Sequence, residues 1–440
     1  MKQLNIKDNQ FRQKSDFEEV KHVVECVSDK TLEQLEREGV FVFPEFIRDT
    51  DDITREQMIL QSYNEMYVSG NVMGFLGAGD ERLVIESRFS SGENDFFFQY
   101  LLYRVLGLPN FINLNTNANQ EDRMFSLLIF LFPHYLKRAA RKGVFKTYIR
   151  RTYNDDNVRG IIEVPRHIRK NTPFVGKIAY SQREHSFDNY LMQLVRHTIE
   201  YIKSKSYGYQ LLSKARDEVK LVVDATHSYH AADRRKILET NRKSFIRHAY
   251  YHEYRDLQRL RILILHRQKH YYAYGKQRMY GILFDGAWLW EEYVAKLLGK
   301  AFYHPMNTKR TGTQHLFDNK EGKIYPDFIS KNSNNRVIAD AKYKPAKNIS
   351  SSDYLQVLAY MYRFDASKGY YLYPENEGNN DRLLWMNEGV TYEKNVKPRG
   401  DICVKKHGLR IPVDANTYDD FVYQIKSNEE KFNKGILCSE

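Results

Sequence analysis

The sequence predicts an α/β (α+β) protein. A mostly helical N-terminal and middle region with a small β-rich part is followed by a domain in which helices flank a mixed sheet. Three observations indicate this fold. Two apolar runs flank a Gly-Asp turn between residues 70 and 88, helical periodicity dominates from 186 to 267, and helix-like and strand-like segments alternate after 271. The chain has 440 residues, of which 42% are hydrophobic, so we expect two or three domains with their own cores.

The N-terminal part contains helical and strand-like segments in turn. The runs VMGFLG and RLVIES, separated by Gly79 and Asp80, predict two short strands. Helical spacing predicts helices at residues 17–27, 31–38, 95–106 and 124–140. We expect the last of these to be interrupted at Pro133, because proline lacks the amide N–H that an inner helical turn uses.

Further helices and a second group of strands follow along the chain. Amphipathic helices are expected at residues 186–203, 211–223 and 254–267. After residue 271 the order is helix, strand, strand, helix, strand, at residues 287–298, 324–330, 336–344, 354–362 and 369–373. This order suits a mixed sheet flanked by helices. We therefore place the main domain boundary near residue 270, which divides the chain into residues 1–270 and 271–440.

Composition excludes several classes of protein. The chain has 68 Lys and Arg against 56 Asp and Glu, a net charge of +12, which favours nucleic acid, anionic membranes or acidic partners. Three cysteines cannot form a disulfide framework, and their separations do not match a zinc site. The N-terminus lacks the apolar core of a signal peptide, and no apolar run approaches the ~20 residues that span a bilayer. We expect a soluble cytoplasmic protein without a membrane partner.

The residues that carry chemistry lie in IYPDFIS (324–330) and RVIADAKYKP (336–345). Twelve residues separate Asp327 from Asp340, and Lys342 follows Asp340 by two. Alternate residues of a strand share a face, so we expect Asp340 and Lys342 to project together. The polar turn between the two segments predicts a hairpin, which would bring Asp327 close to Asp340.

Two neighbouring carboxylates raise each other's pKa unless a cation joins them, and hard oxygen ligands suit Mg²⁺ or Mn²⁺. We therefore expect Asp327 and Asp340 to bind a metal, and Lys342 to orient an attacking water and offset charge in the transition state. The spacing PD-x12-D-x-K matches the PD-(D/E)xK nuclease signature. It predicts a metal-dependent endodeoxyribonuclease, although the same letters also occur by chance in chains of this size.

The flanking helices offer supporting residues. In AWLWEEYVAKLL (287–298) Glu291 lies slightly nearer the centre of the apolar face than Glu292, and is the better candidate for an inward acidic ligand. In DYLQVLAYMYRF, Gln356 and Tyr360 are four residues apart and share a helical face. Ordinary helix surface or core remains an alternative for all of these residues.

The order of these elements resembles the McrC family, the nuclease subunits of McrBC-type restriction systems. The likeness rests on the Trp-Glu helix, Y-P-D, D-A-K-Y-K, Q-x-x-x-Y and a strand ending in Tyr373-Pro374. It extends upstream to LVIESRF, FFFQYLLYRVLG, RGIIEVPRHIRKN and YSQREHSFDNYLMQLVRHTIEYI, and covers most of residues 70–375. The first ~65 residues and the tail after Tyr373 contain no element that matches.

The resemblance implies a function and a partner. It implies that Asp327, Asp340 and Lys342 form the catalytic core, that Glu291 is an auxiliary acidic residue, and that Gln356 and Tyr360 support them. It also implies a McrB-like AAA+ GTPase partner, whose GTP hydrolysis the McrC-like subunit stimulates, and a double-stranded DNA substrate that can carry a base modification. No G-x-x-x-x-G-K-[ST] occurs here, so the motor must be another chain. Residues 271–440 would then be the PD-(D/E)xK nuclease domain.

A basic segment suggests what the rest of the chain does. Residues 137–170 hold eleven Lys and Arg against three Asp and Glu. A solvated surface is one interpretation, and contact with DNA phosphates or an acidic partner surface is the other. On the second interpretation, residues 1–270 dock the partner or contact DNA through Arg150, Arg151, Arg159 and Arg166. Two alternatives remain: a non-catalytic assembly or GTPase-activating subunit, and a stand-alone repair nuclease.

Overall fold

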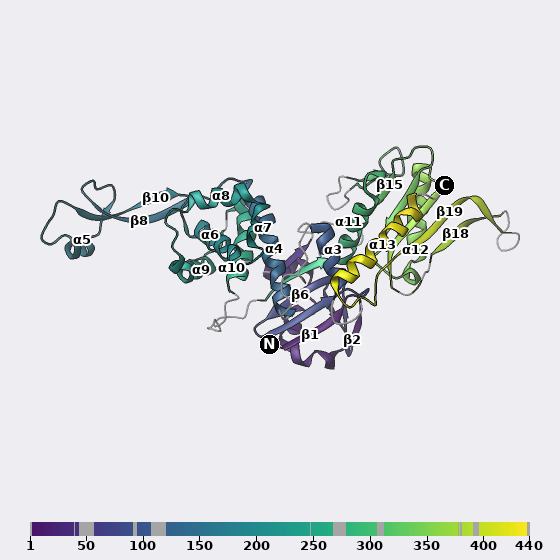
Figure 1. The fold of residues 1–440 in the computed structure, drawn as a ribbon, viewed down its shortest axis with the longest axis horizontal. Helices are drawn as coiled ribbons and strands as arrows, with labels where there is room; N and C mark the ends of the chain where they lie inside the picture. Colours follow the sequence, from purple (N-terminus) through teal and green to yellow (C-terminus); the bar gives the residue numbers. More distant parts are fainter. Residues whose placement is uncertain are drawn as a thin grey trace. The chain divides into compact units, whose positions relative to one another are not determined.

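The computed structural model describes residues 2–38, 40–43, 57–90, 95–106, 120–246, 248–266, 279–305, 312–376, 378, 381–389 and 396–437, with the side chains of 120–127 and 266 excepted. The chain forms two compact units (Figure 1). The first combines residues 1–113 with 275–440, and the second contains 114–274. The boundary expected near residue 270 lies outside the described residues. The division there into a docking region and a nuclease domain stays a prediction.

The first unit begins with a five-stranded sheet in the order β1-β7-β6-β11-β3. Its strands are β1 (Lys2–Lys7), β3 (Phe41–Phe43), β6 (Val72–Ala78), β7 (Glu81–Glu86) and β11 (Tyr280–Asp285). Every residue of β6 is buried, as in a central strand covered on both faces. Gly74 of β6 has a φ of +140°, and a side chain there would lie 2.1 Å from the Ile282 carbonyl oxygen of β11. Glycine therefore permits these two strands to approach each other.

Short elements accompany this sheet. They are the strands β2 (Phe11–Gln13), β4 (Leu60–Tyr63) and β5 (Met66–Ser69), the 3₁₀ helix η1 (Lys14–Val20), and the helices α1 (Lys21–Val27) and α2 (Leu32–Glu38). Val23, Val24 and Val27 of α1 pack with sheet residues such as Leu76 and Leu83 in one apolar core. Burial of these side chains is the main force that holds the helices on the sheet.

A six-stranded mixed sheet forms the C-terminal part of the first unit, in the order β12-β15-β16-β17-β19-β18. Its strands are β12 (Phe302–Tyr303), β15 (Phe328–Ser330), β16 (Val337–Ala341), β17 (Lys368–Glu375), β18 (Arg382–Glu388) and β19 (Lys397–Arg410). Helix α12 (Ser351–Phe364) covers one face, where Val357 and Met361 pack with Ile338 and Tyr371. On the other face, Phe432 of α13 (Tyr418–Leu437) stacks on His407 of β19.

Two more helices lie beside α13. They are α3 (Phe96–Leu106) and α11 (Gly286–Leu298). The buried Glu429 carboxylate of α13 accepts hydrogen bonds of 2.7 Å from the phenols of Tyr100 in α3 and Tyr293 in α11. One carboxylate therefore ties three helices together. A further two-stranded sheet pairs β13 (Gln314–His315) with β14 (Lys323–Ile324).

The second unit is a helical cluster with a long hairpin. Its helices are α4 (Gln120–Ala140), α5 (Val164–Lys170), α6 (Tyr190–Lys203), α7 (Gly208–Ser213), α8 (Arg216–Ala225), η2 (Ala231–Asp233), α9 (Arg234–Lys243), η3 (Ala249–Tyr251) and α10 (His252–His266). The hairpin strands β8 (Thr147–Asp155) and β10 (Ile178–Ser186) pair antiparallel along their whole length, and β9 (Ile161–Ile162) adds to β10. Within this unit, the hairpin and α5 extend beyond the other helices (Figure 1).

The expected helices and the strand pair β6–β7 are confirmed, with three corrections. Helix α4 continues through Pro133, because losing one internal hydrogen bond does not outweigh the burial of its apolar residues. The helix expected at 211–223 is two helices, α7 and α8. The N-terminal region contains more strand than expected: β1, β3 and the β8–β10 hairpin have partners that are distant in sequence, which local periodicity does not indicate. No helix among the described residues is long and apolar enough to cross a membrane.

Candidate active site at the end of strand β16

The expected hairpin is present and brings the acidic residues together. Strands β15 and β16 pair antiparallel, with Phe328 opposite Ala339. Asp340 and Lys342 project from the same side of the second strand, and the Lys342 Nζ atom lies 2.9 Å from the Asp340 Oδ2 atom. Both residues are buried, with 1% and 7% of their surfaces exposed. The pair is therefore a buried ion pair at the end of β16.

Asp327 lies directly before β15 and faces the same strand end. Its Oδ2 atom accepts a hydrogen bond of 2.8 Å from the backbone N–H of Ala341, the residue that follows Asp340. The hairpin thus holds the Asp327 carboxylate against the backbone of the residue that follows Asp340. This is the juxtaposition that the sequence spacing predicted.

Helix α12 supplies further partners of Lys342. The ammonium donates to Gln356 Oε1 at 3.2 Å, and Gln356 Nε2 donates to the Tyr360 hydroxyl at 2.8 Å. Burial raises the pKa of Tyr360 to about 12, so its phenol is neutral at physiological pH. The i, i+4 pair expected on this helix therefore forms a hydrogen-bonded relay that ends on Lys342.

Asp353, which sequence reasoning missed, completes the surroundings of the lysine. Its Oδ1 atom lies 3.6 Å from Lys342 Nζ, and its Oδ2 atom accepts 2.6 Å hydrogen bonds from Lys344 Nζ. Burial alone would raise the pKa of Asp353, but the bonds from Lys344 and the Ser350 backbone N–H, with the Lys342 charge, lower it. The sequence did contain a signal for Asp353: Ser350 and Asp353 have the spacing of a capping box, in which they exchange hydrogen bonds at the start of α12.

Glu291 approaches this site through a histidine. The His304 Nδ1 atom lies 3.8 Å from Glu291 Oε1 and 3.1 Å from the backbone oxygen of Asp327, while Nε2 lies 3.6 Å from Glu292 Oε1. Burial lowers the pKa of His304, but Glu292 and the Asp327 carbonyl outweigh burial and raise it overall. No motif or spacing in the sequence indicated that His304 belongs to this site. The structure links Glu291 to the Asp327 backbone and places Glu292 beside the same imidazole.

The donor set fits a hard divalent cation. Asp327 and Asp340 both offer carboxylate oxygens, and the Asp327 carboxylate is bonded to the amide that directly follows Asp340. Mg²⁺ commonly uses one or two carboxylates with water and phosphate oxygens as its other ligands. Among the described residues, no group of three or more His, Cys, Asp or Glu side chains could hold a metal. A metal here would therefore depend on these two carboxylates and on ligands from water or substrate.

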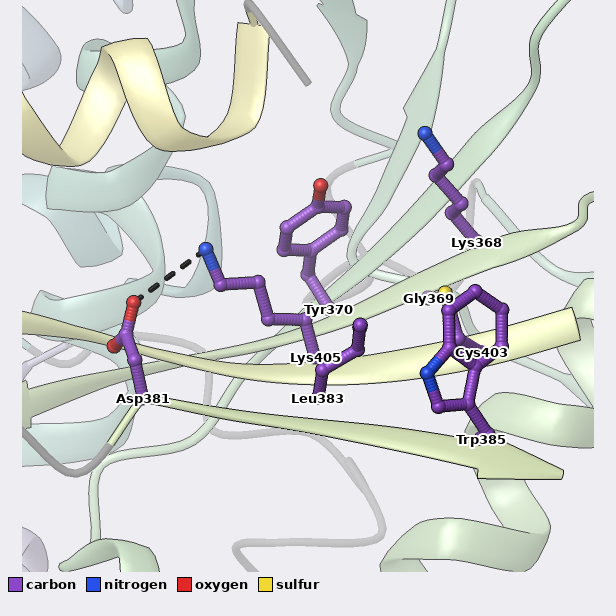
Figure 2. A pocket seen from close by; sticks show the side chains of 8 residues that line it. All are labelled: Lys368, Gly369, Tyr370, Asp381, Leu383, Trp385, Cys403 and Lys405. Atoms are coloured by element: carbon purple, nitrogen blue, oxygen red, sulfur yellow. Dashed lines mark ion pairs between the residues drawn. The ribbon is translucent and has the colours of Figure 1, made fainter. Parts of the chain in front are cut away.

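A pocket on the same sheet does not include these residues. A cavity of about 470 Å³ lies on strands β17, β18 and β19. Figure 2 shows the residues that line it: Lys368, Gly369, Tyr370, Asp381, Leu383, Trp385, Cys403 and Lys405. Tyr370 faces the cavity, whereas its neighbour Tyr371 donates to the Asp353 backbone oxygen of α12. Because side chains alternate along a strand, the cavity lies on the sheet face opposite α12.

The four arginines of the basic segment differ in their surroundings. Arg159 is exposed between β8 and β9. Arg166 of α5 is mostly buried and donates to the backbone oxygens of Tyr153 and Tyr180 at 2.5 and 2.7 Å, so it joins the helix to both hairpin strands. Arg150 donates to Ser181 Oγ at 2.9 Å, and Arg151 lies 3.8 Å from a Glu184 carboxylate oxygen. Arg159 and Arg150, whose side chain is 63% exposed, can thus meet a partner, whereas Arg166 stabilises the hairpin.

Residues 68–374 match the protein family described as McrBC 5-methylcytosine restriction system component. The chain belongs to this family. The matched range agrees with the extent of the resemblance to McrC seen in the sequence, which is confirmed. No curated protein matches the chain.

Solved structures of McrBC assemblies from Thermococcus gammatolerans resemble this McrBC-family protein. The first is a refined half-complex from a tetradecameric assembly of McrB AAA+ hexamers with bound McrC. It matches with a TM-score of 0.51 and 14% identity over 99% of this chain and 100% of that chain. The second, a cryo-EM structure of the McrBC complex, matches with a TM-score of 0.33 and 14% identity over 68% of this chain and 88% of that chain. The first likeness supports a shared fold.

Proposed function

We propose that this McrBC-family protein is the DNA-cutting subunit of a two-component restriction system, a metal-dependent endodeoxyribonuclease of the PD-(D/E)xK type. The observation that carries the proposal is the convergence of Asp327, Asp340 and Lys342 at the end of β16. Family membership supports a role in restriction, and the pairing of β15 with β16, which brings the separate P-D and D-x-K segments together, supports the nuclease assignment.

The chain's own residues account for positioning and charge in such a reaction. Asp327 and Asp340 would hold Mg²⁺ or Mn²⁺, which when bound supplies Lewis-acid polarisation and lowers the pKa of a coordinated water. With DNA bound, the Lys342 ammonium would stabilise the added negative charge on the scissile phosphate in the transition state. Gln356 holds the ammonium in place and Tyr360 holds Gln356. Glu291 would act as an auxiliary acidic residue through its contact with His304.

The partner is proposed to be a McrB-like AAA+ GTPase on a separate chain. Six apolar side chains of the hairpin tip are exposed: Ile161, Ile162, Val164, Ile168, Phe174 and Val175. The basic residues Arg159 and Lys170 lie within the same segment and are also exposed. Exposed apolar side chains at this density are typical of a protein interface, whereas a surface that contacts only DNA backbone has little use for exposed isoleucines. The tip therefore supports partner docking by residues 1–270 over direct phosphate contact.

The test is cleavage of 5-methylcytosine-containing DNA by the reconstituted two-chain complex with Mg²⁺ and GTP. Asp340→Ala should abolish cutting and leave assembly with the partner intact. Undiminished cutting by this variant would remove the assignment. Assembly and GTPase stimulation without any cutting by the wild-type complex would favour the non-catalytic alternative. Metal-dependent cutting by this chain alone, without nucleotide, would favour a stand-alone nuclease.

A further inference from the structure

Tyr343 follows Lys342 directly and points the opposite way. Because side chains alternate along the strand, Lys342 faces α12 while Tyr343 faces the side of α11. Only 5% of Tyr343 is exposed, and burial raises the pKa of its phenol, which is therefore neutral. Two neighbouring residues thus have separate surroundings: one lies in the candidate active site and the other in the interior of the first unit.

The side chains around Tyr343 come mainly from the segment that directly follows strand β7. The Tyr343 hydroxyl lies 2.7 Å from the Ser87 hydroxyl oxygen, the Phe89 ring packs edge-on at 5.1 Å, and the Arg88 guanidinium lies 5.0 Å from the centre of the Tyr343 ring. A side chain at Gly286, the first residue of α11, would come within 2.6 Å of the same ring. The ring is therefore enclosed by three consecutive side chains and a glycine.

This enclosure is itself anchored to the N-terminal sheet. Arg88 Nε donates to the buried Asp8 carboxylate at 2.9 Å, Arg88 Nη2 also donates to Asn71 Oδ1, and Asp8 follows the end of β1. Asp95 Oδ2 accepts a 2.6 Å hydrogen bond from the Ser87 backbone N–H. The buried carboxylates of Asp8 and Asp95 thus hold Arg88 and Ser87 in place, and these two residues in turn contact Tyr343.

The backbone beside Tyr343 is fixed as well. The Lys342 backbone N–H and the Trp290 indole N–H of α11 both donate to the Leu372 carbonyl oxygen, each at 2.9 Å. Lys342 is therefore held at three points: its amide by β17, its ammonium by Asp340 and Gln356, and its C-terminal neighbour by Ser87.

We propose that Tyr343 is a positioning residue for Lys342, and that through Ser87 and Arg88 the N-terminal sheet sets the geometry of the candidate active site. This inference rests on the proposed nuclease function and assigns a role in it to residues 1–90. Small errors in placing a catalytic group cost large factors in rate, roughly 100-fold for a displacement near 1 Å. Loss of one anchor should therefore reduce turnover more than it reduces substrate binding.

The experiment compares Tyr343→Phe, Ser87→Ala and the double variant in the reconstituted complex, on the same 5-methylcytosine-containing DNA with Mg²⁺ and GTP. Each single variant should lower kcat about tenfold and leave KM unchanged. Both substitutions remove the Tyr343–Ser87 hydrogen bond, while Tyr343→Phe also removes a 3.4 Å contact to Met73 Sδ and Ser87→Ala an acceptor of the Phe89 N–H. The loss of kcat in the double variant should therefore be well below the product of the two single losses. Tyr254→Phe is the matched control: it deletes another mostly buried tyrosine hydrogen bond, of 2.7 Å to the Gly143 carbonyl, and should leave kcat unchanged.

The inference would be overturned if both single variants turn over at the wild-type rate although Lys342→Ala abolishes cutting. If the wild-type complex does not cut at all, the proposed function fails, and hydrogen exchange of the Lys342 amide decides the positioning role. Tyr343→Leu should then speed exchange at Lys342 at least tenfold and leave exchange in β10 unchanged. Unchanged exchange at Lys342 would contradict the inference independently of activity.

Discussion

The ammonium of Lys342 lies 2.9 Å from the carboxylate of Asp340 and 3.6 Å from a second carboxylate, that of Asp353. All three residues are buried. A buried charge is costly unless it is paired, so the three side chains depend on one another for stability as well as for chemistry. Substitutions at this site are therefore expected to affect folding, and each needs a measurement of stability beside one of activity.

Lys342→Ala should abolish DNA cleavage and destabilise the protein. Removing the ammonium leaves Asp340 and Asp353 buried without it, which typically costs about 3–5 kcal/mol. Chemical denaturation measures the loss of stability, and a cleavage assay measures activity. The double variant Lys342→Met with Asp340→Asn should recover part of this stability without recovering activity, because Asp353 keeps Lys344 as its partner and no charged Asp340 remains. Recovery of cleavage in that double variant would contradict the catalytic role of the lysine.

Metal removal should stop cleavage, and metal binding should depend on both carboxylates. Chelation by EDTA is expected to abolish activity, and excess Mg²⁺ to restore it. Since a bound ligand stabilises the folded state, 100-fold excess over Kd should add about 2.7 kcal/mol of stability in the wild type. Asp327→Asn should lose this Mg²⁺-dependent rise in Tm, whereas Asp381→Asn, on the pocket side of the sheet, should keep it. An equal rise in Asp327→Asn would argue against the proposed ligand.

The relay from α12 should tune the rate without being essential. Gln356→Ala removes the acceptor of the Lys342 ammonium, and Tyr360→Phe removes the hydroxyl that holds Gln356. The bond from the Lys342 ammonium to Gln356 is charge-assisted and contributes about 1.5–3 kcal/mol, whereas the neutral Gln356–Tyr360 bond contributes about 1 kcal/mol. We therefore expect kcat to fall at least tenfold in Gln356→Ala and roughly fivefold in Tyr360→Phe. Tyr362→Phe, at an exposed site on the same helix, is the control and should be silent. Wild-type kcat in Gln356→Ala would show that the relay has no role.

The hairpin arginines should separate into docking and structural residues. Arg159→Glu is expected to weaken partner binding at least tenfold with normal thermal stability, because Arg159 is exposed. Arg166→Ala should instead lower stability by about 1.5–3 kcal/mol, since it leaves the Tyr153 and Tyr180 carbonyls without a charged donor. Pull-down with the partner and thermal unfolding distinguish the two. Loss of DNA binding alone in Arg159→Glu would indicate phosphate contact.

Because of Glu86, the stability of the first unit should decrease as the pH rises from acidic to neutral. Burial, with the nearby Asp95 charge, raises the pKa of Glu86 from 4.5 to about 7. A carboxyl with a raised folded pKa stabilises the fold while it is protonated, so this contribution is complete below pH 4.5 and is lost as pH rises through about 7. Glu86→Gln, which retains an acceptor for Asn5, should raise Tm at pH 8 relative to wild type but not at pH 4. The exposed Glu430→Gln is the control.

The sequence predicted the candidate site better than the fold around it. The hairpin, the approach of Asp327 to Asp340, and the Gln356–Tyr360 pair follow from strand and helix periods over short distances, which the sequence displays directly. Their catalytic and metal-binding roles stay predictions. Asp353 could have been found, because its capping box is a local signal.

The remaining features depend on contacts that no local pattern encodes. His304 meets the Asp327 carbonyl because β12 pairs with β15, and Tyr343 meets Ser87 across 256 positions of sequence. Strand β1 was missed because its partner β7 lies some 80 residues away. The β8–β10 hairpin was concealed by its charged residues, which read as a solvated surface.

Strand β11 lies between β6 and β3 in the N-terminal sheet, although residues 87–279 separate it from the earlier strands. A nascent chain leaving the ribosome therefore exposes one edge of the wholly apolar β6 until Asp285 has emerged. At about 5–20 residues per second this interval lasts roughly 10 to 40 seconds. During it, an uncovered strand edge can pair with another chain, so production of the protein should depend on chaperones and on slow, cool expression.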